Sequence, residues 1–195
     1  MEPAQRERLS EAEYLERERA SDEKHELVNG ELVAMAGSTR QHSQITANII
    51  RSLGNRFADR PCVVHTSDRR VNVATTRLYA YPDVSVVCGP EQSHPQDHNT
   101  LRNPTLIVEV LSDSTELYDR GAKFAHYQNL ASMREYLLVS QKERIVERYE
   151  RIDGDEWRYT RFTGGAIVPL PSVAAELPLD EVYLKVEFAG DGEVA

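Results

Sequence analysis

Three charged side chains in the middle of the sequence have the types and spacing that could hold a divalent cation. Asp83 begins one apolar segment, Glu109 lies inside the next, and Lys123 belongs to the segment that follows. Carboxylates on neighbouring strands suit Mg²⁺, which keeps several waters and is completed by substrate phosphate. Such a metal lowers the pKa of a bound water, and a lysine can orient that water or stabilise developing negative charge. Paired acids beside a lysine also occur as inert buried ion pairs, so the spacing leaves both interpretations open.

Glu109 lies within a continuous apolar run, residues 106–111, which is entered after Pro104 and left at Ser112. Such a run is typical of a strand that is covered on both faces. A carboxylate in a buried strand is unfavourable unless a cation or a hydrogen-bond donor compensates it. The sequence therefore predicts that Glu109 has a partner elsewhere in the chain.

Lys123 is the candidate partner, because its helix begins directly after the Glu109 strand. Residues 112–115 offer serine and threonine caps for a helix over about 116–130. Asp119, Lys123 and Tyr127 are spaced four apart and share one face of this helix. An exposed ion pair between Asp119 and Lys123 is the alternative. Connectivity favours a site role, since the first turns of the helix must pack over the sheet end that carries Glu109.

Two further candidates precede Asp83. The segment 26–35 has the pattern of a hairpin around Asn29-Gly30, with Glu26 and Glu31 beside the turn, where carboxylates are usually solvated. His42 lies on the inward face of a helix whose apolar side chains recur every four residues up to Phe57. A hydrogen-bonded residue at a helix start is the alternative interpretation for His42.

The composition is that of a globular protein with an acidic balance. The chain has 195 residues, 40% of them hydrophobic and 28% charged, and a formal net charge of −9. This length predicts a single domain over 1–195, and the order of its expected helices and strands predicts the α/β class. The charge argues against a protein whose whole surface binds nucleic acid, but it allows a local basic cleft.

The sequence also predicts where the protein resides. It has no apolar span long enough to cross a membrane and no signal-peptide core at the N-terminus, so we expect a cytoplasmic protein without membrane association. Cys62 and Cys88 each lie beside valine in strand-like runs. We expect both to be small buried hydrophobes in a reducing compartment rather than a disulfide pair.

Taken together, these motifs resemble the Uma-two family of restriction-endonuclease-like proteins, within the PD-(D/E)XK nuclease superfamily. The resemblance covers about Leu9 to Phe188. It rests on Glu26-Leu-Val-Asn-Gly-Glu31, His42, Pro82-Asp83, Pro104 to Thr115 with Glu109, Asp119 to Lys123 with Tyr127, and Arg134 to Val139. It implies a restriction-endonuclease-like αβββαβ core with a mixed central sheet, an N-terminal helix and hairpin, and a C-terminal strand pair.

The resemblance also implies an activity, namely Mg²⁺-dependent hydrolysis of phosphodiester bonds in DNA, with Mn²⁺ as a possible substitute. Matched by position, Asp83 is the aspartate of the PD element, Glu109 is the second acidic residue, and Val110 is the residue X whose carbonyl would also bind the metal. The superfamily lysine expected two residues after Glu109 is absent, because Leu111 stands there. The resemblance therefore assigns its role to Lys123.

The resemblance also implies that His42 replaces a glutamate of the first core helix and that Glu31 extends the outer shell of the metal. A non-catalytic member of the family, structural or DNA-associated, is the alternative, and the net charge of −9 favours it. A metal-free hydrolase is disfavoured, because no serine or cysteine stands in an activating context. Edge strands expected within 144–162 also predict a possible homodimer.

Overall fold

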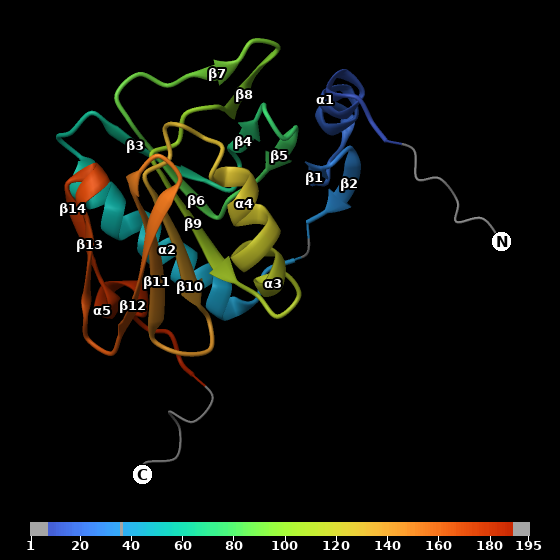
Figure 1. The fold of residues 1–195 in the computed structure, drawn as a ribbon. Coiled ribbons are helices and arrows are strands. Elements are labelled where there is room, and N and C mark those ends of the chain that lie inside the picture. Colours follow the sequence, from blue (N-terminus) through green and yellow to red (C-terminus); the bar gives the residue numbers. More distant parts are fainter. Residues whose placement is uncertain (1–7, 36, 189–195) are drawn as a thin grey trace.

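The central element of the fold is a mixed six-stranded sheet built from the apolar runs of the sequence. The computed structural model describes residues 8–35 and 37–188 (Figure 1). The strand order is β12-β11-β10-β9-β6-β3, with β9 and β10 parallel and the other neighbours antiparallel. The strands are β3 (Cys62–Thr66), β6 (Val84–Cys88), β9 (Leu106–Leu111), β10 (Glu135–Ser140), β11 (Ile145–Asp153) and β12 (Glu156–Thr163). The mixed α/β fold expected from the sequence is confirmed.

Helix α2 (Arg40–Phe57) covers one face of this sheet. Its buried side chains Ile45, Ile49, Leu53 and Phe57 recur every four residues and pack against valines of β6 and β9. The helix begins at Thr39, whose hydroxyl accepts a hydrogen bond from the His42 backbone N–H at 3.1 Å. The periodicity of the sequence therefore predicted this helix and its buried face correctly.

The opposite face is covered by the segment after β9, which is not the continuous helix expected over 116–130. It consists of α3 (Glu116–Tyr118), a π-helical turn (Asp119–Lys123) and α4 (Phe124–Tyr127). A π-helical turn contains more residues than an α-turn and therefore rotates the side chains that follow it. Both Asp119 and Lys123 are buried in this turn.

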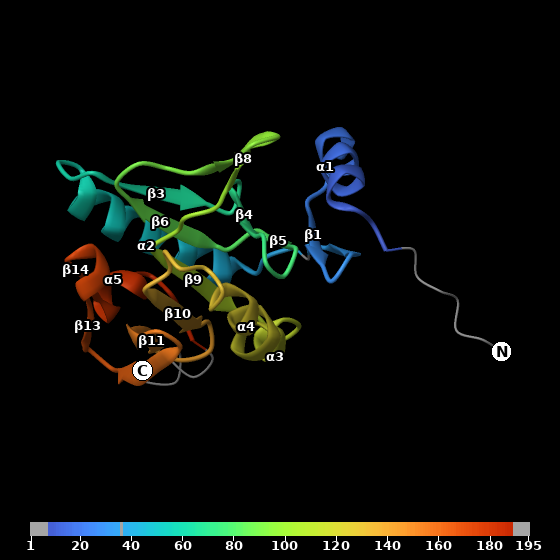
Figure 2. The same cartoon turned by 45° about the horizontal axis from the view of Figure 1, so that its top comes forward.

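A second six-stranded sheet, with the order β2-β1-β5-β4-β8-β7, lies beside the first (Figure 2). Its strands are β1 (His25–Val28), β2 (Glu31–Ala34), β4 (Arg70–Val73), β5 (Leu78–Ala80), β7 (Ser93–His94) and β8 (Asp97–Leu101). Asn29 and Gly30 take φ of 53° and 88°, which confirms the tight hairpin predicted between β1 and β2. Helix α1 (Glu11–Ala20) has the capping box of Ser10 and Glu13 and buries Tyr14 and Leu15.

The C-terminal part adds the hairpin of β13 (Ile167–Leu170) and β14 (Ala175–Pro178), followed by α5 (Leu179–Val182). Helix α5 packs against α2, where the Asn48 side chain donates hydrogen bonds to the carbonyls of Val182 and Leu184 at 3.0 and 2.9 Å. Among the described residues, no helix combines the length and apolar character needed to cross a membrane.

The expectation for the two cysteines is wrong, because Cys62 and Cys88 form a disulfide. The two residues face each other directly in the antiparallel pair of β3 and β6, and both are only partly buried. Each cysteine belongs to a strand-like run, but the pairing of those strands depends on a register between distant segments. The argument from cysteine usage for a reducing compartment therefore no longer holds.

Candidate active site

Lys123 and Glu109 form the buried centre of the candidate site. Nζ of Lys123 lies 2.9 Å from Oε1 of Glu109, and the Tyr127 hydroxyl donates a hydrogen bond to the same oxygen at 3.2 Å. Glu109 is on β9, whereas Lys123 and Tyr127 come from the segment that covers this strand. The partner that the buried carboxylate required is therefore the lysine expected from the connectivity.

Two further carboxylates surround the same ammonium group. Glu26 of β1 approaches Lys123 to 3.3 Å, and Asp119 approaches it to 3.6 Å from one turn earlier. Glu26 is itself positioned by the backbone N–H of Tyr81, which donates to Oε1 at 3.0 Å. The hairpin of the second sheet thus supplies an acid to a cluster whose other members belong to the first sheet and its covering segment.

Asp83 lies at the beginning of β6 and is held by two partners. Its Oδ2 accepts a hydrogen bond from the backbone N–H of Val110 at 2.7 Å, and Nε2 of His42 lies 3.2 Å away. The side chains of Asp83 and His42 remain 14% and 16% exposed, against 4% and 7% for Glu109 and Lys123 in their ion pair. The Asp83 end of the cluster is therefore the end that a substrate can approach.

The cluster carries more acid than base, and this imbalance shifts its pKa values. Burial raises the pKa of Glu109 well above its usual range, and the charges of Asp119, Asp83 and Glu26 add to this, while Lys123 opposes it. Burial also raises the pKa of Asp119. Burial by itself would lower the pKa of Lys123, but the three surrounding carboxylates outweigh it and raise that pKa well above normal. Lys123 therefore remains an ammonium, and the surrounding acidic groups would be stabilised by a further positive charge.

The pKa of His42 is also shifted by the negative charges of this cluster. Burial lowers its pKa, but the hydrogen bond and the negative charge of Asp83 outweigh burial and raise the pKa above its usual value. The His42 ring also interacts with the backbone of Val110. The first turn of α2 is therefore fixed against the two strand ends that carry Asp83 and Glu109.

The donor set of this cluster fits a magnesium ion. Within residues 8–35 and 37–188, no three His, Cys, Asp or Glu side chains are grouped closely enough to form a metal cage. Mg²⁺ does not require one, because it is usually bound by one or two carboxylates together with waters and substrate phosphate. Oδ1 of Asp83 and Oε2 of Glu109 accept no hydrogen bond from any described residue. These two oxygens and the Val110 carbonyl are the ligands that the site can offer.

The structure brings together most of the residues that the sequence singled out. Asp83, Val110 and His42 are in contact, and Glu109 is paired with Lys123. Asp83 is also close enough to Glu109 to raise its pKa. For Glu31, which opens β2 and is partly buried, a role in the outer shell stays a prediction.

Among the further members of the cluster, Glu26 and Asp119 are open candidates in the sequence, and Tyr118 is the one that no sequence pattern indicates. Glu26 and Glu31 both flank the hairpin turn, but Glu26 pairs opposite Val33 with its side chain buried, whereas Glu31 is partly buried. The spacing of Asp119 and Lys123 predicts their shared face but not the burial of Asp119. Tyr118 was not considered, although burial raises its pKa and the charges of Glu26 and Lys123 act on it. Glu26 and Leu27 are consecutive buried residues, so the hairpin does not alternate between buried and exposed positions and offers no such sequence signal for Glu26.

A matched pair of tyrosine variants tests the geometry of the cluster. Tyr127→Phe removes the hydrogen bond to Glu109 and should lower the free energy of unfolding by about 1.5–3 kcal/mol, as for bonds to charged groups. Tyr118→Phe removes a buried hydroxyl that has no hydrogen-bond partner among the described residues, so stability should be unchanged or slightly higher. Urea unfolding of both variants measures the difference, and equal losses would contradict the arrangement.

Comparisons with known proteins show the family and the fold of the chain. Residues 11–181 match the model of the Uma2 family, which is described as "Putative restriction endonuclease". Two uncharacterized proteins of Synechocystis sp. are similar to the chain. One is 34% identical over 93% of this chain and 94% of its own length, and the other is 35% identical over 80% and 88%. A crystal structure described as a putative nuclease belonging to DUF820, from Anabaena variabilis, superposes with a TM-score of 0.72 at 18% identity, over 90% of this chain and 97% of that one. At that identity, the likeness supports a shared fold.

Proposed function

Since the chain belongs to the Uma2 family, we propose that it is a metal-dependent endonuclease that hydrolyses phosphodiester bonds in DNA. The observation that carries this proposal is the meeting of Asp83, the Val110 backbone and Glu109 at one end of the central sheet, with Lys123 paired to Glu109. Two carboxylates, one carbonyl and one ammonium are the groups that phosphodiester hydrolysis with Mg²⁺ uses.

In this proposal Asp83, Glu109 and the Val110 carbonyl hold Mg²⁺, and Mn²⁺ could replace it. When bound, the metal supplies a water of lowered pKa and neutralises charge on the scissile phosphate. His42 keeps the Asp83 carboxylate in place from 3.2 Å, and the Val110 N–H donates to the same carboxylate oxygen, Oδ2. The protein thereby fixes the ligand geometry before substrate arrives.

The role of Lys123 follows from its surroundings. Three carboxylates raise its pKa, so it remains protonated and is unsuited to accept a proton from water. Its ammonium group can instead donate a hydrogen bond that orients the attacking water, or stabilise the negative charge that develops on phosphate. Glu31, which belongs to the same hairpin as Glu26, is proposed to extend the outer shell of the metal.

The proposal includes two features of context. The first is a cytoplasmic location. A homodimer is proposed through β12, which forms the outer edge of the central sheet and exposes 51% of Tyr159. Unpaired edge strands are surfaces to which a second chain can add.

A non-catalytic, structural or DNA-associated role is the second candidate. The observation in its favour is that Lys123 is fully surrounded by carboxylates, as in a buried ion-pair network that serves only stability. The two candidates differ in whether the protein turns over a substrate.

The test is the conversion of supercoiled plasmid to nicked and linear forms by the full chain. We expect conversion with Mg²⁺ or Mn²⁺ and none with EDTA, because the acidic cluster would then lack the cation that neutralises the phosphate. Isothermal titration with each metal should show weak but measurable binding. A protein that binds neither metal and leaves the plasmid intact would support the structural role instead.

A further inference from the structure

Helix α2 contains no acidic residue, although the chain as a whole is acidic. Asp and Glu make up 32 of the 195 residues, and at that frequency about three of the 18 residues of α2 would be acidic. Instead, its charged side chains are Arg40, Arg51 and Arg56, together with His42. The longest helix of the described chain therefore carries positive charge only.

Two of these arginines lie on the outer face of the helix. Arg40 and Arg51 are exposed and eleven positions apart, which is close to three full turns and roughly 16 Å along the axis. The exposed positions between them include the small residues Ser43 and Ala47. Small side chains between two arginines allow a long, narrow polyanion to approach the helix closely.

Two acidic residues lie near this face, Glu181 and, beside Arg40, Glu187, against the three arginines of the helix. Glu181 of α5 is held by the third arginine, with Arg56 nitrogens at 2.8 and 2.9 Å from its oxygens. Arg40 and Arg51 make no hydrogen bond or ion pair with any residue in the described ranges. Their charge is therefore available to a partner.

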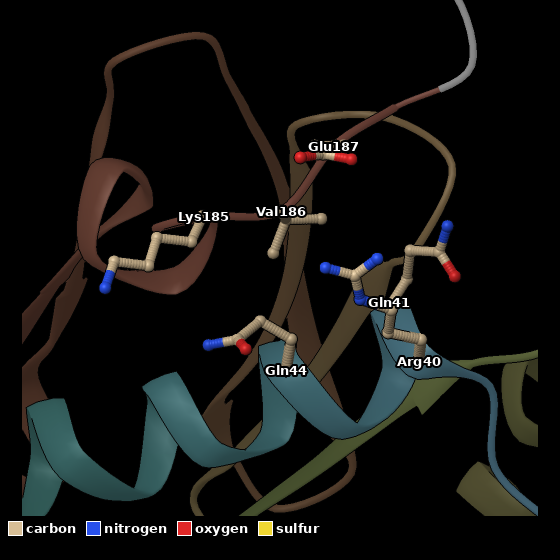
Figure 3. Close-up of a pocket in the computed structure, with 6 residues that line it drawn as sticks. All are labelled: Arg40, Gln41, Gln44, Lys185, Val186 and Glu187. Carbon is tan, nitrogen blue, oxygen red and sulfur yellow. The ribbon is translucent and has the colours of Figure 1, made fainter.

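A small hollow lies at the N-terminal end of the helix, where Figure 3 shows Arg40, Gln41 and Gln44 beside the C-terminal segment with Lys185 and Glu187. Its volume is about 30 Å³, far below the roughly 300–1,000 Å³ of a pocket that holds a small-molecule ligand. A nucleotide does not fit into it. The surface that a large ligand can use is thus the open face of the helix rather than this hollow.

The outer face is continuous with the candidate active site. Arg40 lies two positions before His42, which contacts Asp83 at 3.2 Å from the same helical turn. Figure 1 shows that this end of α2 lies beside the end of β9, where Val110 is located. A strand that crosses the site near Asp83 can therefore continue over the first turn of α2 and along its outer face.

We infer that the outer face of α2, with Arg40 and Arg51, binds the sugar–phosphate backbone of DNA on one side of the scissile bond. This inference rests on the proposed function, and it adds the place where the substrate is held. A strand of duplex DNA offers one phosphate per about 3.4 Å of helix axis, so several phosphates lie within reach of the two arginines. Arginine contacts to phosphate position DNA without reading its sequence, so this surface holds any sequence equally.

The test compares two double variants of the full chain that remove the same charge. Arg40→Gln/Arg51→Gln alters the proposed surface, whereas Arg17→Gln/Arg134→Gln alters exposed arginines on α1 and just before β10. Affinity for a fluorescein-labelled DNA duplex is measured by anisotropy in EDTA, between about 50 and 200 mM salt. The α2 variant should bind about tenfold more weakly at low salt, and the slope of log affinity against log salt should fall by roughly two.

The inference is supported if only the α2 variant loses affinity and salt slope, and if Arg40→Lys/Arg51→Lys retains most of both. It is overturned if the α2 variant binds like the wild type, if both glutamine doubles lose affinity equally, or if the wild type does not bind the duplex. Thermal unfolding checks that all variants are folded. Plasmid cleavage is measured separately. If DNA binding depends on Arg40 and Arg51 but no nicking occurs, the proposed endonuclease activity is refuted, whereas the proposed DNA-binding surface is still supported.

Discussion

The Asp83→Asn variant should lose metal-dependent plasmid cleavage by on the order of 10³-fold or more, because a metal contributes several kcal/mol to such transition states. The substitution removes one negative charge and one of the two proposed carboxylate ligands. The amide oxygen of asparagine can still accept the hydrogen bond that the Val110 N–H donates at 2.7 Å. We therefore expect the fold to persist while metal binding and cleavage are lost.

The measurement is nicking of supercoiled plasmid with Mg²⁺ or Mn²⁺, together with isothermal titration of each metal. Asp180→Asn is the matched control, because Asp180 is an exposed partner of Arg144 at 3.3 Å and lies outside the cluster. This control should cleave like the wild type. Cleavage that survives in Asp83→Asn would show that the nuclease acts elsewhere or is a contaminant.

Lys123→Ala should produce the largest loss of stability, about 3–5 kcal/mol in the free energy of unfolding near neutral pH. Removal of the ammonium leaves Glu109, Glu26 and Asp119 together without their common cation. Uncompensated buried charge is far more destabilising than a lost surface ion pair. The same variant should also lose cleavage, because no other described cation pairs with Glu109.

The stability deficit of Lys123→Ala should shrink as the pH falls. Burial already raises the pKa of Glu109 and Asp119 above the unfolded value, and Lys123 opposes that rise in the wild type. Without Lys123, both pKa values rise further. A carboxyl with a raised pKa makes the native state bind more protons than the unfolded chain, so the native state is penalised as pH rises through the folded pKa. Below about pH 4, where the unfolded carboxyls are also protonated, this penalty vanishes.

Urea unfolding at pH 8, 7, 6 and 5 measures this dependence, with each variant compared to the wild type at the same pH. Lys142→Ala is the control, because Lys142 pairs with Asp113 in an exposed ion pair and its removal should change stability little at any of these values. A Lys123→Ala protein as stable as the wild type at pH 8 would contradict the buried cluster. So would a deficit that grows on acidification.

Local patterns in the sequence determined the elements that frame the site. The four-residue spacing from Ile45 to Phe57 specified the buried face of α2, because an α-helix brings such positions onto one side. Asn29-Gly30 specified the hairpin through its positive φ angles. The apolar run around Glu109 required a partner for the carboxylate, and the helix that follows directly could bring Lys123 there. Each of these inferences uses residues that are close in sequence.

Only the tertiary structure decided which distant residues meet. Glu26 reaches Lys123 because β1 pairs with β5, which fixes the hairpin next to Tyr81. Asp119 and Lys123 are both buried in a π-helical turn, which replaces the continuous α-helix that the periodicity predicts. Cys62 and Cys88 are bonded because β3 and β6 pair in one register, and a shift by a single residue would turn their side chains apart.

The sequence by itself thus determined the element types and the pairing of Glu109 with Lys123, since these depend on short-range periodicity and chain connectivity. Packing between the two sheets decided that Glu26 joins the cluster and that carboxylates outnumber the ammonium group of Lys123. Strand pairing within the first sheet decided the disulfide. Strand register and the contact between sheets minimise the free energy of the whole chain, and no single segment encodes them.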